Sequence, residues 1–211
     1  MRADMGLFKK FVNQTRKPEG LLGKLMVGGM NSGHAKLADW GMEYLDGITA
    51  ASIAELGCGG GRNAAELLKR YPDAVLTALD YSEISVRKAQ KANQAAIRAG
   101  KCKVMQGNVS SLPFKNASFD LATAFETVYF WPGPEQSFSE VSRIIKPGGV
   151  FMICNESDGT DEAALKYEKI IDGMKCYTET QLKTALLSAG FSRVKSVHHS
   201  KKPWIVVIGY K

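Results

Sequence analysis

Short apolar runs alternate with amphipathic segments along most of the chain after residue 50. The apolar runs have the length and composition of buried strands, and the segments between them have helical spacing. The predicted strands are residues 51–56, 74–80, 101–108, 118–125, 148–156, 191–199 and 203–211. The predicted helices after residue 50 are residues 63–71, 82–100, 132–145 and 178–190. This alternation predicts an α/β fold with a doubly wound, mostly parallel sheet of seven strands.

Local signals support several of these boundaries. Ser82 is a suitable N-cap for the helix over 82–100, and Thr178 with Gln181 forms a capping box for the helix over 178–190. Gly190 is a suitable stop for that helix. The last two predicted strands follow one another with no helix between them. We therefore expect them to form an antiparallel pair at the edge of the sheet.

The first 47 residues lack this regular pattern. Pro18 interrupts them, and the GGMNSGH stretch at 28–34 interrupts them again. Residues 35–45 have apolar positions on one helical face. We therefore divide the chain into an N-terminal helical lid or substrate-capping segment, residues 1–47, and a main domain, residues 48–211.

Composition supports a globular protein with a substantial core. Hydrophobic residues make up 45% of the chain and charged residues 23%. No window approaches the roughly 18 consecutive apolar residues of a membrane span, and the N-terminus lacks the features of a secretory signal. We therefore expect a cytoplasmic protein. Its four cysteines form no CxxC pair, which argues against a zinc site and favours reduced, mostly buried thiols.

The formal net charge is +7, and the excess of basic residues gathers at the two ends of the chain. Such a balance is compatible with a nucleic-acid partner, with an anionic ligand, or with a solvated surface. No basic run is interleaved with aromatic residues. This argues against nucleic-acid binding without excluding it.

Four glycines fall within the five residues 57–61, between the first predicted strand and the first helix after it. Glycine lets backbone N–H groups approach a ligand closely, so this turn predicts a ligand site. Counted from Gly59, the turn fits the GxGxxA form of a dinucleotide fingerprint, and Asp80 follows Gly61 by 80 − 61 = 19 residues. A nicotinamide dinucleotide is therefore one candidate ligand.

The stretch that begins at Glu55, ELGCGGG, has the form E-x-G-x-G-x-G. Here the chain resembles the class I S-adenosylmethionine-dependent methyltransferases, and especially the small-molecule superfamily that includes quinone-biosynthesis enzymes. The resemblance extends over about residues 50–211. It also rests on LDYSE at 79–83, GNVSSLPF at 107–114, FDLATAFETVYFWP at 119–132 and IIKPGGVF at 144–151. It implies a Rossmann-like fold and S-adenosylmethionine as cofactor, with S-adenosylhomocysteine as product.

The same resemblance implies roles for individual residues. The glycine turn faces the methionine part of the cofactor, Asp80 binds the ribose hydroxyls, and the segment around Asn108 lines the adenine. The implied cofactor-binding residues are Glu55, Gly57, Cys58, Gly59, Gly61, Asp80, Tyr81, Asn108, Val109, Phe125 and Glu126. The family usually has an aspartate at the position of Asn108. The side-chain carbonyl of an asparagine can still accept a hydrogen bond from the adenine amino group.

The loop after the fourth predicted strand is expected to meet the methyl acceptor. Glu126 has three candidate roles: contact with the amino group of the cofactor, general base, or cap of the next helix. Tyr129, with Phe130 and Trp131, forms either an aromatic wall around the acceptor or ordinary core packing. His34 lies at a predicted break between helices and is either a general base or a cap or structural histidine. The candidate catalytic residues are His34, Glu126 and Tyr129.

The expected reaction is an in-line methyl transfer to a small molecule, in which proximity and orientation do most of the work and no metal is needed. The loop after the fourth strand lacks the Asp/Asn-Pro-Pro-aromatic motif of enzymes that methylate base amines. Cys154 lies in the fifth strand, where it does not fit a nucleophile for pyrimidine C5. An RNA or protein methyltransferase and a non-catalytic cofactor-binding module remain alternatives. The protein is expected to be a monomer or a homodimer.

Overall fold

The computed structural model describes residues 34–211. The predicted lid, residues 1–47, therefore lies largely outside the described residues, and its division from the main domain stays a prediction. The part of the lid that is described contains helix α3 (Ala35–Glu43), as the apolar spacing of residues 35–45 predicts. None of the described helices is long and apolar enough to span a membrane.

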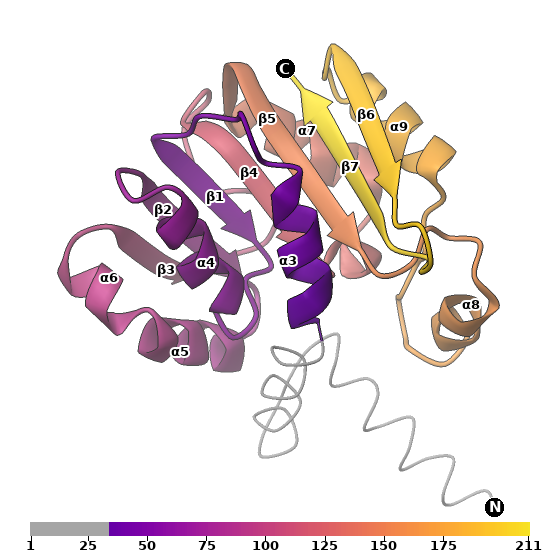
Figure 1. The fold of residues 1–211 in the computed structure, drawn as a ribbon, viewed down its shortest axis with the longest axis horizontal. Helices are drawn as coiled ribbons and strands as arrows, with labels where there is room; N and C mark the ends of the chain where they lie inside the picture. Colours follow the sequence, from indigo (N-terminus) through magenta and orange to yellow (C-terminus); the bar gives the residue numbers. More distant parts are fainter. Residues whose placement is uncertain (1–33) are drawn as a thin grey trace, which may run out of the picture.

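A seven-stranded sheet runs through the centre of the molecule (Figure 1). The strands are β1 (Ser52–Leu56), β2 (Val75–Asp80), β3 (Cys102–Gln106), β4 (Phe119–Phe125), β5 (Ile145–Asn155), β6 (Arg193–His198) and β7 (Ile205–Tyr210). Their order is β3-β2-β1-β4-β5-β7-β6. All neighbours from β3 to β5 pair in parallel, and β7 pairs antiparallel with both β5 and β6. The predicted strand number, the mostly parallel sheet and the antiparallel edge pair are confirmed.

Helices cover both faces of this sheet, as a doubly wound fold requires. One face carries α3, α4 (Arg62–Arg70) and α5 (Glu83–Ala92), followed by the short α6 (Gln94–Arg98). The opposite face carries α7 (Pro134–Ile144) and α9 (Glu179–Ser188). The remaining elements are a 3-10 turn, η2 (Val128–Phe130), and a short helix, α8 (Glu162–Glu168), beside the carboxyl end of β5 (Figure 1).

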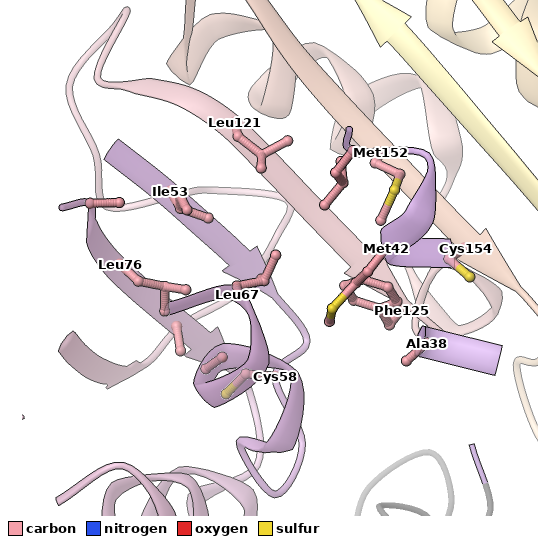
Figure 2. Packing of buried hydrophobic residues seen from close by; sticks show 14 of the residues in the cluster. Ala38, Met42, Ile53, Cys58, Leu67, Leu76, Leu121, Phe125, Met152 and Cys154 are labelled. Atoms are coloured by element: carbon pink, nitrogen blue, oxygen red, sulfur yellow. The ribbon is translucent and has the colours of Figure 1, made fainter. Parts of the chain in front are cut away.

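Each face has its own apolar cluster. On the α3 face, Ile53, Leu121 and Met152 from three neighbouring strands are fully buried and lie beside Leu67 of α4 and Met42 of α3 (Figure 2). On the other face, apolar side chains of α7 and α9 pack against the alternate residues of the same strands. Helix α3 is therefore part of the main core.

Close packing of helix α3 on the sheet depends on Gly41. A Cβ atom at this position would lie only 2.5 Å from Cys154 Sγ on β5. Because Cys154 in turn donates toward Leu37 O, two positions of α3 are in contact with this strand. All four cysteines are free and buried, and their burial agrees with the prediction.

The structure differs from the prediction in three places. The helix predicted over 82–100 is interrupted at Asn93, whose Nδ2 donates to Ala89 O and, at 2.8 Å, to Gly61 O in the glycine turn. Strand β5 begins at Ile145, earlier than predicted, because Phe119 of β4 already pairs with that residue. Helix α8 was not predicted. Its N-cap is Asp161, whose side chain accepts from Ala164 N.

Candidate active site

A cavity of about 280 Å³ opens at the carboxyl ends of β1, β2 and β4. Strand order reverses between β1 and β4, so this is the edge at which doubly wound sheets bind their ligands. The cavity is lined by the glycine turn, by the ends of β2 and β3, by the start of α3, and by the loop after β4. The sequence-predicted residues among its lining are His34, Gly57, Cys58, Gly59, Asp80, Tyr81, Asn108, Val109, Phe125 and Glu126.

The glycine turn is held against β2 by its own backbone. The N–H groups of Gly57 and Cys58 both donate to Leu79 O, at 2.7 and 3.0 Å. Gly57 has φ +81°, and a Cβ atom there would lie 2.1 Å from Thr127 Oγ1 in the loop after β4. Glycine is therefore required at this point both by conformation and by a close approach between two loops.

Gly59 and Gly61 also have positive φ angles but different surroundings. Nothing lies within 4 Å of a Cβ atom built on Gly59, which lines the cavity. A Cβ atom on Gly61 would meet Ala89 Cα at 2.7 Å, because α5 packs directly on the turn. Gly59 thus leaves room for a ligand, whereas Gly61 leaves room for a helix.

Asp80 ends β2 with its carboxylate facing the glycine turn. It accepts hydrogen bonds from Gly59 N and Ser82 N, each at 2.8 Å, and is 7% exposed. Burial raises the pKa of Asp80, and these N–H donors oppose the rise. A carboxylate held this way at the cavity wall keeps acceptor capacity for hydroxyl groups of a ligand.

Glu55 lies beneath the turn and is 1% exposed. Burial, followed by the charge of Asp80, raises its pKa to about 8. Its Oε2 atom has no hydrogen-bond partner within residues 34–211. Burial also raises the pKa of Cys58 well above its usual value, so this thiol stays protonated. Neither residue therefore brings a second negative charge to the site at neutral pH.

Asn108 follows β3 and lines the cavity with Gly107 and Val109. Its Oδ1 accepts a hydrogen bond from Ser110 N at 2.9 Å. A carbonyl oxygen has two lone pairs, so one remains for a further donor. The local turn therefore fixes which way the amide points, as a role in adenine binding would need.

Glu126 has an unusual conformation directly after β4. Its φ of +58° falls in the left-handed region, which is rare for residues other than glycine. Its Oε1 accepts from Tyr129 Oη at 3.1 Å and from Glu156 N. Burial raises the pKa of Glu126 to about 8. The hydrogen bond from Glu156 N opposes this rise, and the negative charge of Glu156 adds to it. Because the carboxyl bonds to the end of β5, it does not cap the following η2 turn.

The three aromatic residues after Glu126 separate into different roles. Trp131 is 6% exposed, stacks on Phe151 at 6.1 Å between ring centroids, and donates from Nε1 to Thr127 Oγ1. Trp131 and Phe130 both line the cavity. Tyr129 is 4% exposed, and its hydroxyl connects Ser157 N to Glu126. The loop thus contributes both cavity wall and core packing.

His34 occupies the N-cap position of α3, and its side chain makes no cap hydrogen bond. It points instead toward two carboxylates: its Nδ1 lies 3.9 Å from Glu126 Oε2, and its Nε2 lies 3.7 Å from Glu156 Oε2. Burial lowers the pKa of His34, and the charge of Glu156 opposes this. Glu156 was absent from the sequence-predicted site. Its position directly after an apolar strand is the signal that also marks Asp80.

Residues 54–153 match the model of a methyltransferase domain. The malonyl-[acyl-carrier protein] O-methyltransferase of Herminiimonas arsenicoxydans is 30% identical over 157 residues, which is 72% of this chain and 57% of that protein. An O-methyltransferase of Pyrenophora dematioidea is 26% identical over 69% of this chain and 55% of its own length.

The fold agrees with these matches. A SAM-dependent methyltransferase from Aquifex aeolicus superposes with a TM-score of 0.72 at 16% identity, covering 89% of this chain and 97% of that one. Residues 54–153 thus match a methyltransferase domain, and the fold is that of the class I S-adenosylmethionine-dependent methyltransferases. The predicted Rossmann-like fold and the predicted family are thereby confirmed, and the cofactor of this family is S-adenosylmethionine. The chain spans little more than half the length of either curated relative named above.

The residues present fit that cofactor. The open side of Gly59 admits a ligand to the backbone of the turn, and Asp80 is an available acceptor for ribose hydroxyls. The orphaned Oε2 of Glu55 lies beneath the turn, and Glu55 itself does not line the cavity. The nicotinamide alternative receives no support from the family match.

Proposed function

We propose that this protein transfers a methyl group from S-adenosylmethionine to a small-molecule acceptor. The observation that carries the proposal is one cavity with two chemically different ends. We call the part lined by the glycine turn, Asp80 and Asn108 the inner end, and the part lined by His34 and Glu126 the outer end. When bound, the cofactor supplies an activated methyl group on a sulfonium, so no metal is required for the transfer.

In this proposal Asp80 binds the ribose hydroxyls and Asn108 reads the adenine edge. Gly57, Cys58, Gly59, Tyr81, Val109 and Phe125 complete the lining of the cofactor site. Glu55 beneath the turn and Gly61 against α5 support the turn without lining the cavity. His34 takes the proton of the acceptor, and Glu126 holds the acceptor beside it. Tyr129 is a positioning residue, because its hydroxyl is buried and fixes Glu126 rather than lining the cavity.

A small acceptor is supported by the size of the cavity and by the relatives named as O-methyltransferases. About 280 Å³ is at the lower end of ordinary ligand pockets, so a cofactor leaves little room for a second large molecule. Parallel assays with a labelled methyl donor and small-molecule extract, RNA or protein as acceptor test this. Label in RNA, with binding that falls steeply as salt rises, would instead favour the nucleic-acid alternative.

The cofactor assignment is tested by calorimetric titration with S-adenosylmethionine, S-adenosylhomocysteine and NADH. Both adenosyl ligands should bind, and Asp80→Ala should weaken them about 100-fold, because two hydrogen bonds to a charged group are lost. Asp80→Asn, which preserves shape, separates loss of charge from misfolding. Asp73→Ala is the matched control, since Asp73 is exposed on the turn before β2. Binding of NADH alone would contradict the assignment.

A further inference from the structure

Three polar side chains from three distant segments converge beside the outer end of the cavity, and two of them, His34 and Glu126, line it. One nitrogen of His34, one oxygen of Glu126 and one oxygen of Glu156 all lie within 4.8 Å of one another. The Oε1 atom of Glu126 already accepts from Tyr129 Oη and from Glu156 N. Its Oε2 atom is the one that faces His34. The cluster therefore presents one acceptor atom from each residue to the same small volume.

Among residues 34–211, no unpaired Arg or Lys side chain that lines the cavity offsets the charge of Glu156, which helps to raise the pKa of Glu126. The one Arg or Lys side chain among the described residues that line the cavity is Arg62, which already pairs with Asp39 Oδ1 at 2.6 Å and with Asn63 Oδ1 at 3.1 Å. Glu126, whose pKa is raised to about 8, is protonated at neutral pH in the free protein, and a positive ligand beside Glu126 and Glu156 favours its ionised form. The aromatic ring of Phe130, also in the cavity wall, adds a surface suited to an organic cation.

The spacing of the three atoms admits an ammonium group. An ammonium has three N–H donors, and three acceptors each about 2.8 Å from its nitrogen in tetrahedral directions lie about 4.6 Å apart. Three ligands of a tetrahedral zinc at about 2.1 Å lie only about 3.4 Å apart. The 3.9 Å contact of Glu126 Oε2 is with His34 Nδ1, and the 3.7 Å contact of Glu156 Oε2 is with His34 Nε2. One nitrogen and the two oxygens together lie within 4.8 Å of one another, which admits the ammonium spacing.

We propose that His34, Glu126 and Glu156 bind the ammonium group of the methyl acceptor, which is therefore a primary amine. This inference rests on the proposed function and names its substrate class. The ammonium gives one proton to the neutral imidazole of His34, which frees the nitrogen lone pair. That lone pair forms the new N–C bond while the C–S bond breaks and its electrons stay on sulfur. The products are a methylated ammonium and S-adenosylhomocysteine, and the proton leaves through the partly exposed edge of His34.

The substrate class can be tested before the substrate is known. A small-molecule extract is separated into fractions that bind a cation exchanger, bind an anion exchanger, or bind neither. Each fraction is then incubated with the protein and S-adenosylmethionine labelled in the methyl group. Label should appear in the cation-exchanger fraction. Label only in the anionic or neutral fraction overturns the inference while leaving the proposed function intact.

Variants connect that result to the cluster. Glu156→Gln should raise the KM for the active cationic fraction about five- to tenfold with a smaller effect on kcat. Glu162→Gln is the matched control, because Glu162 is exposed on α8 and lies outside the cluster of His34, Glu126 and Glu156. Equal KM values for the two variants overturn the role of Glu156.

A binding measurement supplies a readout independent of turnover. Benzylammonium, benzyl alcohol and Zn²⁺ are titrated into the protein saturated with S-adenosylhomocysteine. Benzylammonium should bind at least ten times more tightly than the alcohol, and Glu156→Gln should reduce this preference. Equal binding, binding of neither, or binding of Zn²⁺ alone contradicts the ammonium site. Benzylammonium binding without label in any fraction supports the cation site and counts against the proposed function.

Discussion

Substitution of Gly59 or Gly61 by alanine separates the two uses of glycine in the turn after β1. Both residues have positive φ angles, +51° and +80°, so alanine at either position adds about 1–2 kcal/mol of backbone strain. Gly61→Ala also forces a Cβ atom against Ala89 and Asn93 of the α5 region. Overpacking of this kind adds about 1–3 kcal/mol. We expect total losses of about 2–5 kcal/mol for Gly61→Ala and about 1–2 kcal/mol for Gly59→Ala.

The effects on ligand binding should have the opposite order. The Cβ atom of Gly59→Ala enters the open space of the cavity, so this variant should bind S-adenosylhomocysteine at least tenfold more weakly. Gly61→Ala, if still folded, should bind with a smaller loss. Urea unfolding gives the stability difference, and calorimetry gives the affinities. Wild-type affinity in Gly59→Ala, or equal loss of stability in both variants, would refute the assignment of one glycine to the ligand and the other to α5.

Three further predictions concern single side chains. Burial alone would raise the pKa of Asp120, but hydrogen bonds from Lys146, from Ser52 and from backbone N–H groups lower it to about 2. The contribution of Asp120 to the unfolding free energy is therefore complete above about pH 4 and is lost as the pH falls toward 2. Asp120→Asn should make the unfolding free energy less dependent on pH in this acid range. The pKa of Glu126 is raised to about 8, so the unfolding free energy of the wild type should fall as the pH rises from about 4.5 to 8. Glu126→Gln lacks this titration, so over the same range its unfolding free energy should rise relative to that of the wild type by at most about 5 kcal/mol. Chemical unfolding of both proteins at pH 4.5 and at pH 8 measures this difference. Trp131→Ala should lower the unfolding free energy by about 3–5 kcal/mol, and Trp131→Phe by about 1 kcal/mol, because the ring on Phe151 is kept and only the Nε1 bond is lost.

The fold was predictable because its signals are local. Each central strand is a short apolar run, and the capping box of Thr178 and Gln181 is present as predicted. The interruption at Asn93 was not predictable in the same way, because its cause is a hydrogen bond to Gly61, 32 residues earlier. Most residues of the long helix prediction are good helix formers and Asn93 has only a weak preference against a helix, so the tertiary contact shows where the helix is interrupted.

The inner end of the cavity was also accessible from sequence. Asp80 ends an apolar strand and the glycines follow one, so a parallel sheet brings them to one edge. Gly59 and Gly61 could not be distinguished on that basis. Both satisfy the same motif, and only the packing of α5 shows that one faces a helix and the other a cavity. Motif spacing thus identified the glycine turn but not which glycine faces the cavity and which faces α5.

The outer end illustrates why an acceptor site is harder to predict. His34, Glu126 and Glu156 come from the start of α3 and from the ends of β4 and β5, and nothing in their spacing relates them. What relates them is sheet order: β4 and β5 are parallel neighbours, so the residues after both strands lie side by side. Tyr129 then fixes Glu126, and the N–H of Ser157 fixes Tyr129, so the loops after both strands hold one carboxyl in place. The backbone of Glu126 is in the left-handed region, and its Oε1 accepts two hydrogen bonds. Its Oε2 is therefore directed toward His34 at the outer end of the cavity. A rigid acidic group beside a neutral histidine is therefore a consequence of the fold, and it is this arrangement that makes the charge of the acceptor the property most open to experiment.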